Sequence, residues 1–184
     1  MARRDRAPQR GGLRIIAGTH RGHRIAAPPG RDTRPTSDRV RENLFNLVGP
    51  VDGADVLDLF AGSGALGLEA LSRGAASATF VESDRDACRV INANLDKLGF
   101  RGIVLCQDVI RALSTERRSF DLVLCDPPYD YDRARLNDEL APLLEPAGLL
   151  VLETAGREDA PDVPGLQQRT SRRYGAARLT LFEL

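Results

Sequence analysis

Long apolar runs and cysteines are scarce in this sequence. No stretch is apolar over the length needed to cross a membrane, and the arginine-rich start has no apolar segment of the kind that a secretory signal needs. The three cysteines, Cys88, Cys106 and Cys125, are odd in number and too far apart for a zinc knuckle, which favours buried thiols. We therefore expect a cytoplasmic protein with no membrane segment and no bound metal.

Lysine is almost absent too, since 25 of the 26 basic residues are arginine. Residues 1–34 hold nine arginines against two aspartates, a net charge of +7, whereas residues 35–184 hold 17 basic and 24 acidic residues, a net charge of −7. Coding bias could explain arginine in place of lysine, but not this separation by sign. A basic arm on an acidic body is typical of a protein that binds nucleic acid.

The division of charge predicts two regions, a basic arm at 1–34 and a folded domain at 35–184. Within the arm, residues 13–17 and 23–27 have the pattern of two short strands around a glycine-containing turn, which predicts a small β-hairpin. The arginines of this hairpin and of the linker after it are the predicted nucleic-acid contacts: Arg14, Arg21, Arg24, Arg31 and Arg34.

From residue 55 onward, short apolar runs alternate with helical patterns, as in parallel βαβ units. Strands are expected at 55–60, 78–82, 102–106, 120–125 and 148–153. Helices are expected at 36–48, 64–73, 84–98, 108–114 and 133–144. The last two strand patterns, 166–173 and 177–184, leave no room for a crossover helix and predict an antiparallel hairpin. The fold class is therefore α/β, and a monomer is the default expectation.

The stretch at 56–70 is the centre of this pattern, because a buried strand, a glycine turn and a helix follow one another directly. Glycines let the backbone approach a ligand closely, and the N–H groups at a helix start attract electron-rich atoms. The spacing of Gly62, Gly64 and Gly67, with Glu82 about 20 residues further on, matches the dinucleotide fingerprint.

Asp58 favours a different ligand. This carboxylate lies inside the apolar strand before the turn, where the pyrophosphate of a dinucleotide would meet it as a second anion. S-adenosylmethionine (SAM) has a cationic amino-acid end and a ribose, which suit Asp58 and Glu82. The alternative is that Asp58 caps the helix or forms a salt bridge, because a carboxylate in an apolar strand is costly without a partner.

Ligands of parallel sheets bind beyond the carboxyl ends of the strands, so the acids at those ends are candidates as a set. Glu82 could accept from ribose hydroxyls, and Asp108 from an adenine amino group with Val109 beside it. The predicted SAM site comprises Asp58, Phe60, Ala61, Gly62, Ser63, Gly64, Glu82, Asp108 and Val109.

Asp126 also ends a strand, but it leads into Pro127, Pro128 and Tyr129. Two prolines stiffen the loop, so the Asp126 carboxylate and the Pro127 carbonyl become fixed acceptors beside an aromatic ring. A planar base with an exocyclic amino group fits this set, because it can stack on Tyr129 while the acceptors hold its N–H groups. The alternative is a rigid surface turn, which the preceding buried run at 120–125 disfavours.

Four motifs in this order resemble the RsmD family of bacterial 16S rRNA guanine-N2 methyltransferases. They are LRIIAGTHRGHRI, RPTSDRVRENLFN, LDLFAGSGALGLEALSRGA and DPPY, and the resemblance covers nearly all of 13–184. It implies a SAM-dependent Rossmann-like fold of seven strands with the last antiparallel, a small N-terminal hairpin, and a guanine of the small ribosomal subunit as the target. The motif residues Asp126 to Tyr129 would then orient guanine N2 toward the methyl group of SAM.

Other activities share parts of this pattern. A methyltransferase acting on DNA adenine or on protein glutamine would have the same catalytic loop, and only the basic arm and the N-terminal resemblance favour rRNA. A nicotinamide oxidoreductase would share the glycine turn but would place its pyrophosphate against Asp58. A non-catalytic RNA-binding module is disfavoured by the intact Asp126 to Tyr129 loop.

Overall fold

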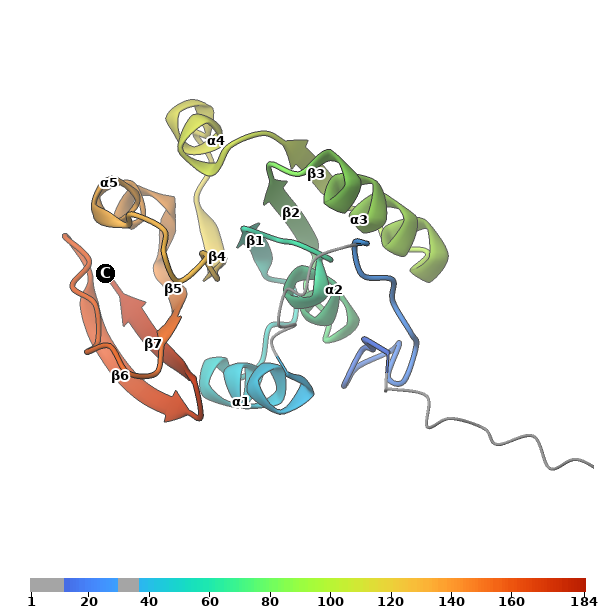
Figure 1. Cartoon of the computed structure of the whole chain (residues 1–184), viewed down its shortest axis with the longest axis horizontal. Helices are drawn as coiled ribbons and strands as arrows, with labels where there is room; N and C mark the ends of the chain where they lie inside the picture. Colours follow the sequence, from blue (N-terminus) through green and yellow to red (C-terminus); the bar gives the residue numbers. More distant parts are fainter. Residues whose placement is uncertain (1–11, 30–36) are drawn as a thin grey trace, which may run out of the picture.

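The computed structural model describes residues 12–29 and 37–184, which form a seven-stranded sheet with helices on both faces (Figure 1). The strand order is β3-β2-β1-β4-β5-β7-β6. The strands are β1 (Asp55–Leu59), β2 (Ser77–Glu82), β3 (Ile103–Cys106), β4 (Phe120–Cys125), β5 (Leu144–Ala155), β6 (Gln167–Tyr174) and β7 (Ala177–Glu183). The first five run parallel, and β7 is antiparallel to both of its neighbours, which confirms the α/β fold and the closing hairpin.

One helix precedes β1, and the others fill the connections between the parallel strands. They are α1 (Asp38–Val48), α2 (Ala65–Ser72), α3 (Arg85–Leu98), α4 (Val109–Thr115), α5 (Ala134–Asp138) and the 3-10 helix η1 (Ala141–Leu143). The helix predicted at 133–144 is wrong in its second half, because Pro142 lies at the start of η1 and has no N–H to continue an α-helix. Strand β5 consequently begins at Leu144, four residues earlier than predicted.

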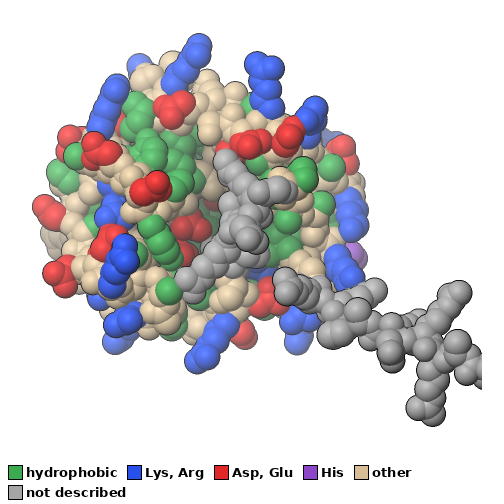
Figure 2. All heavy atoms as spheres, in the orientation of Figure 1, with side chains coloured by type: hydrophobic (Ala, Val, Ile, Leu, Met, Phe, Trp, Pro, Cys, Tyr) green, Lys and Arg blue, Asp and Glu red, His purple; other side chains and the backbone are tan. Residues whose placement is uncertain are grey.

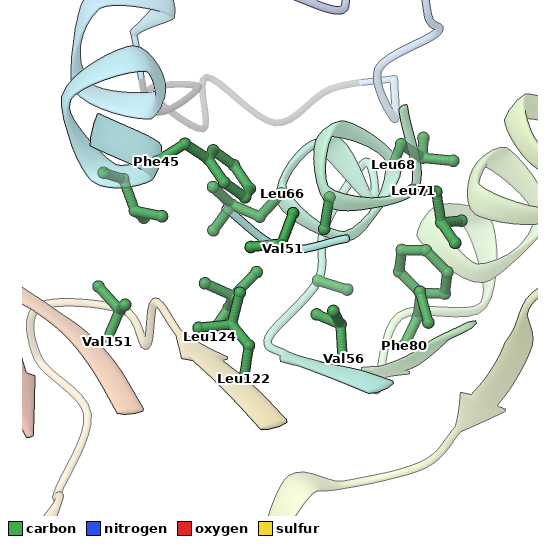
Figure 3. Close-up of a cluster of buried hydrophobic side chains, with 14 of the residues drawn as sticks. Phe45, Val51, Val56, Leu66, Leu68, Leu71, Phe80, Leu122, Leu124 and Val151 are labelled. Atoms are coloured by element: carbon green, nitrogen blue, oxygen red, sulfur yellow. The ribbon is translucent and has the colours of Figure 1, made fainter. Parts of the chain in front are cut away.

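The two faces of the sheet bury separate apolar clusters. Helices α1, α2 and α3 pack on one face, where Phe45 and Leu66 meet strand residues such as Leu122 and Leu124 (Figure 3). Helices α4 and α5 pack on the other face, around Val123. Because β1 lies inside the sheet between β2 and β4 and is buried over residues 56–59, the loop that follows it is held between two packed layers.

The described cysteines differ in burial. Cys88 and Cys125 are buried, as expected, but Cys106 is exposed because it ends the short edge strand β3, so that part of the expectation is wrong. Within the described ranges, no helix is both long and apolar enough to cross a membrane.

The two segments predicted as strands, 13–17 and 23–27, pair antiparallel, but too briefly to form regular strands. A single antiparallel bridge joins Arg14 to Arg24, flanked by hydrogen bonds such as Ile25 N–H to the Leu13 carbonyl at 2.9 Å. The backbone turns instead toward α2, whose side chains and carbonyls accept its amide protons. Ile15 and Ile25 also enter the apolar cluster under α1, α2 and α3, so residues 12–29 are packed onto the body of the fold.

Glu69 of α2 is the main polar anchor of this N-terminal segment. Its side chain is completely buried, and its carboxylate accepts from the amides of Ile16 at 2.8 Å and Ala17 at 3.0 Å. The Arg73 guanidinium donates to the same carboxylate at 2.8 Å. A buried carboxylate without hydrogen-bond donors would strongly destabilise the fold, so the burial of Glu69 requires these donors to be in place.

We expect Glu69→Ala to release the N-terminal segment from α2. The change leaves two amide N–H groups and Arg73 without their acceptor, which costs on the order of 3 kcal/mol in the free energy of unfolding. Urea unfolding measures that loss, and hydrogen exchange at Ile16 and Ala17 reports the release directly. Glu42→Ala, on the exposed face of α1, is the matched control. Unchanged exchange at both amides would show that Glu69 does not anchor the segment.

Candidate active site

The carboxyl ends of the central strands open into a cavity of about 860 Å³. Its walls come from these strand ends, from α1 and from Leu13, Ala27 and Pro28 of the N-terminal segment. A cavity of this size is within the range of small-molecule and cofactor sites. The strand ends were the place where the sequence predicted a ligand.

Most of the predicted site residues meet in this one cavity. Those that line it are Asp58, Phe60, Ala61, Gly62, Ser63, Glu82, Asp108, Val109, Asp126, Pro127, Pro128 and Tyr129. Gly64 is outside the lining, because it caps α2 with a φ of 78° and faces Ile91 and Phe80. Arg14, Arg21 and Arg24 are also outside it, and the predictions for Arg31 and Arg34 fall outside the described residues.

The loop after β1 is shaped by its hydrogen bonds to β2. The Gly62 amide donates to Glu82 Oε2 at 2.8 Å, and the Ala61 amide donates to the Val81 carbonyl at 3.0 Å. Phe60 has a φ of 60°, a left-handed conformation that is costly for a residue with a side chain. Glu82 therefore holds the loop in position as well as lining the cavity.

Asp58 contacts the start of α2, as one interpretation of the sequence predicted, and it also lines the cavity. Its side chain is 1% exposed and lines the cavity, and its Oδ2 accepts from the Gly67 amide at 2.9 Å, in the first turn of α2. Burial raises the pKa of Asp58 to about 7, with Asp126 and Glu82 adding like-charge repulsion and the Gly67 hydrogen bond opposing the shift. The cavity thus contains a carboxyl group that a nearby cation would readily ionise.

Asp108 and Val109 lie at the start of α4. Asp108 caps this helix, with its Oδ1 accepting from the Arg111 amide at 3.1 Å. Val109 is buried beside it. The cap fixes the side chain of Asp108 at the cavity edge, beside the apolar side chain of Val109.

The Asp126 to Tyr129 loop follows β4 and forms the opposite wall. Pro127 is buried, whereas Tyr129 is 39% exposed and leaves part of its ring open to a ligand. The Pro128 carbonyl accepts from the Tyr131 amide at 2.9 Å, and the Tyr131 ring meets Phe60 edge to face at 4.9 Å. This contact joins the loop after β4 to the loop after β1, and residues of both loops line the same cavity.

A family model described as Conserved hypothetical protein 95 matches residues 13–183. The chain belongs to this family, the RsmD family. It is 41% identical over 162 residues to Ribosomal RNA small subunit methyltransferase D of Escherichia coli K12, covering 84% of this chain and 80% of that protein.

Solved structures agree with this RsmD-family fold. The Escherichia coli protein yhhF matches with a TM-score of 0.82 and 36% identity over 94% of this chain and 97% of that one. A hypothetical protein of Thermus thermophilus matches with a TM-score of 0.80 and 34% identity, covering 94% and 99%. The similarity therefore covers nearly the whole length of this chain and of both matched chains.

Two charged cavity residues were missed in the sequence. Glu153 is 7% exposed at the end of the strand predicted at 148–153, so the rule that selected the other strand-end acids would have found it. Arg41 is 1% exposed, and its Nη2 donates to the Arg14 carbonyl at 2.7 Å and to Asp38 at 2.9 Å. Burial lowers the pKa of Arg41. Arg41 lies on the helix predicted at 36–48 and lines the cavity.

Asn94 of α3 connects the N-terminal segment to the glycine loop. Its side chain is 1% exposed and exchanges two hydrogen bonds with the backbone of Ala26, at 2.8 and 3.0 Å. The same amide nitrogen donates to the Ser63 carbonyl at 3.1 Å. A displacement of the segment would therefore reach the glycine loop through one buried side chain.

Proposed function

We propose that this RsmD-family chain transfers a methyl group from S-adenosylmethionine to the exocyclic N2 of a guanine in 16S rRNA of the small ribosomal subunit. The observation that carries the proposal is that the loop with Asp58 behind it and the loop from Asp126 to Tyr129 open into one cavity. The names of relatives support the substrate class, since the Haemophilus influenzae protein, 37% identical over 154 residues, is also a Ribosomal RNA small subunit methyltransferase D.

The residues at the β1 and β2 ends fit a SAM-sized ligand with a cationic end. Asp58 would hold the amino group, Glu82 the ribose hydroxyls, and Asp108 with Val109 the adenine. The bound SAM supplies an electrophilic methyl group. Burial raises the pKa of Asp58 to about 7, so in the ligand-free protein at neutral pH the carboxyl group is only partly ionised. A bound cation would favour the ionised form.

The residues at the β4 end fit the acceptor base. An exocyclic amino nitrogen is a poor nucleophile because its lone pair is delocalised into the ring, so positioning and hydrogen bonding must supply most of the acceleration. Tyr129 provides a partly open ring for stacking, and Asp126 with the Pro127 carbonyl provides acceptors for the amino protons. Such a loop would present the amino nitrogen to the methyl group of SAM.

Exposed arginines near the cavity also support an RNA substrate. Figure 2 shows arginine or lysine side chains around much of the outline of one face, with acidic side chains among them, and hydrophobic side chains toward its centre. Arg21 and Arg24 are exposed on the N-terminal segment, which borders the cavity through Leu13, Ala27 and Pro28. RNA phosphates bound at such a rim would leave the cavity free for a single base.

We expect the double substitution Arg21→Gln with Arg24→Gln to weaken RNA binding and to reduce its salt dependence. Each lost phosphate contact lowers the slope of log affinity against log salt by about 0.7 to 0.9, so the double variant should lose between about one and two. Removal of residues 1–30 is a poorer test, because Ile15 and Ile25 belong to the core. The control is Arg111→Gln with Arg117→Gln on the α4 side. An equal effect of the two pairs would refute a specific role for the segment.

The activity itself is tested by transfer of a labelled methyl group from SAM to small ribosomal subunits from cells that lack this protein. The RNA is then digested to nucleosides. N2-methylguanosine is the expected product. Label in N6-methyladenosine or in ribosomal protein would overturn the substrate, and failure of SAM to bind, with NADH bound instead, would overturn the donor.

A further inference from the structure

Glu153 stands next to the proposed catalytic aspartate. Strand β4 pairs with β5 in parallel, with Cys125 opposite Leu152, so Asp126, directly after β4, and Glu153, the next residue of β5, follow on neighbouring strands. Adjacent strands in a sheet are about 4.8 Å apart, which brings the two acids within reach of one small ligand. Glu153 is 7% exposed and lines the same cavity as Asp126.

The two side chains also leave the sheet on the same face. Successive residues of a strand alternate between faces, and Leu124 and Val151 belong to the apolar cluster under α1, α2 and α3. Glu153 is two residues further along β5 than Val151 and so projects toward that side. Asp126 lies directly after β4, and its charge acts on Asp58, which is two residues after Val56 of the same cluster. The hydroxyl of Tyr129 is 3.5 Å from Glu153 Oε1, which places the Glu153 carboxylate at the edge of the proposed stacking ring.

The geometry points to Glu153 as the residue that selects guanine, a reading that rests on the proposed function. The Watson–Crick edge of guanine presents N1–H and N2–H₂ side by side, so it offers donors to two neighbouring acceptors. We propose that Asp126 binds the N2 amino group and that Glu153 accepts from N1–H. A base with an unprotonated N1, such as adenine or 2-aminopurine, would turn a lone pair toward the Glu153 carboxylate and be rejected.

The test compares guanine with 2-aminopurine at the target position. The methylated guanine is first located in wild-type product, and subunits are then reconstituted with 2-aminopurine at that site. This base keeps the N2 amino group but carries an acceptor at N1. We expect wild-type protein to use it at least about 100-fold less efficiently than guanine, as for other sites built around one substrate N–H.

Glu153→Gln should reduce that preference to about tenfold or less, because a Gln amide can donate to an unprotonated N1. SAM affinity should stay within about threefold of wild type, since Glu153 lies at the base side of the cavity. Glu183→Gln, with the same charge change on an exposed part of β7, is the control and should keep the full preference.

The outcomes separate the two proposals. Absence of N2-methylguanosine in the wild-type reaction would overturn the proposed function itself. Guanine methylation with equal use of 2-aminopurine by the wild-type protein would overturn the role of Glu153 alone, whether or not the variant folds. An unchanged preference in a folded Glu153→Gln protein would overturn it as well.

Discussion

Asp126→Ala should abolish methyl transfer while SAM binding remains. Asp126 lines the cavity at the start of the Pro127 to Tyr129 loop, where it would hold the amino protons of the base. Loss of one such preorganised group costs about 10²- to 10³-fold in kcat, and loss of the positioning of a weak nucleophile adds to that. We therefore expect a decrease of at least about 10³-fold in the rate under single-turnover conditions.

SAM affinity should change little in this variant, or become slightly tighter. The charge of Asp126 is one of the causes that raise the pKa of Asp58, so its removal favours the ionised Asp58 that a cationic ligand needs. Calorimetry on Asp126→Ala measures the affinity, and Asp126→Asn should recover part of the rate because one acceptor oxygen remains. Asp130→Ala, an exposed carboxylate of the same loop, is the control. A loss of SAM affinity as large as the loss of rate would contradict the proposal that SAM binds around Asp58 and the base binds at the Asp126 to Tyr129 loop.

The site was largely predictable because its main parts are local in sequence. The strand, the glycine turn and the helix around Asp58 are consecutive, and the Asp126 to Tyr129 loop directly follows an apolar run. The alternation of strands and helices predicted a parallel sheet, and the carboxyl ends of parallel strands lie along one edge of the sheet. Glu153 was missed although the same rule covers it, since it has no distinctive motif after it.

The errors arose where distant residues decide the local structure. The backbone at Ile16 and Ala17 bonds to Glu69, more than 50 residues away, and no pattern within 13–27 could reveal that acceptor. Arg41 was missed for the same reason, because its burial depends on a hydrogen bond to the distant Arg14 carbonyl as well as on its own helix. The end of the helix predicted at 133–144 was different, since Pro142 was visible in the sequence and should have shortened it.

Asp58→Asn should stabilise the ligand-free protein at neutral pH and weaken SAM binding. The pKa of Asp58 is about 7 in the folded protein, against 3.8 for an ordinary aspartate. Between these values the folded state binds more protons than the unfolded state, so the free energy of unfolding falls as pH rises from about 4 to about 7 and stays lower above it. The shift corresponds to a loss on the order of 4 kcal/mol, which the neutral Asn does not incur.

Binding of a cation at Asp58 has the opposite pH dependence. A cationic end of the ligand favours the ionised form of Asp58. As the pH increases toward about 7, the affinity of the wild-type protein for SAM should therefore rise by up to about tenfold per pH unit, and above about 7 it should level off. Below that pH, binding should release a proton. In Asp58→Asn the affinity should be lower at pH 8 and almost independent of pH. Urea unfolding from pH 5 to 8 and calorimetry in two buffers of different ionisation enthalpy measure both effects. Parallel pH profiles for the two proteins would show that Asp58 does not titrate in the binding site.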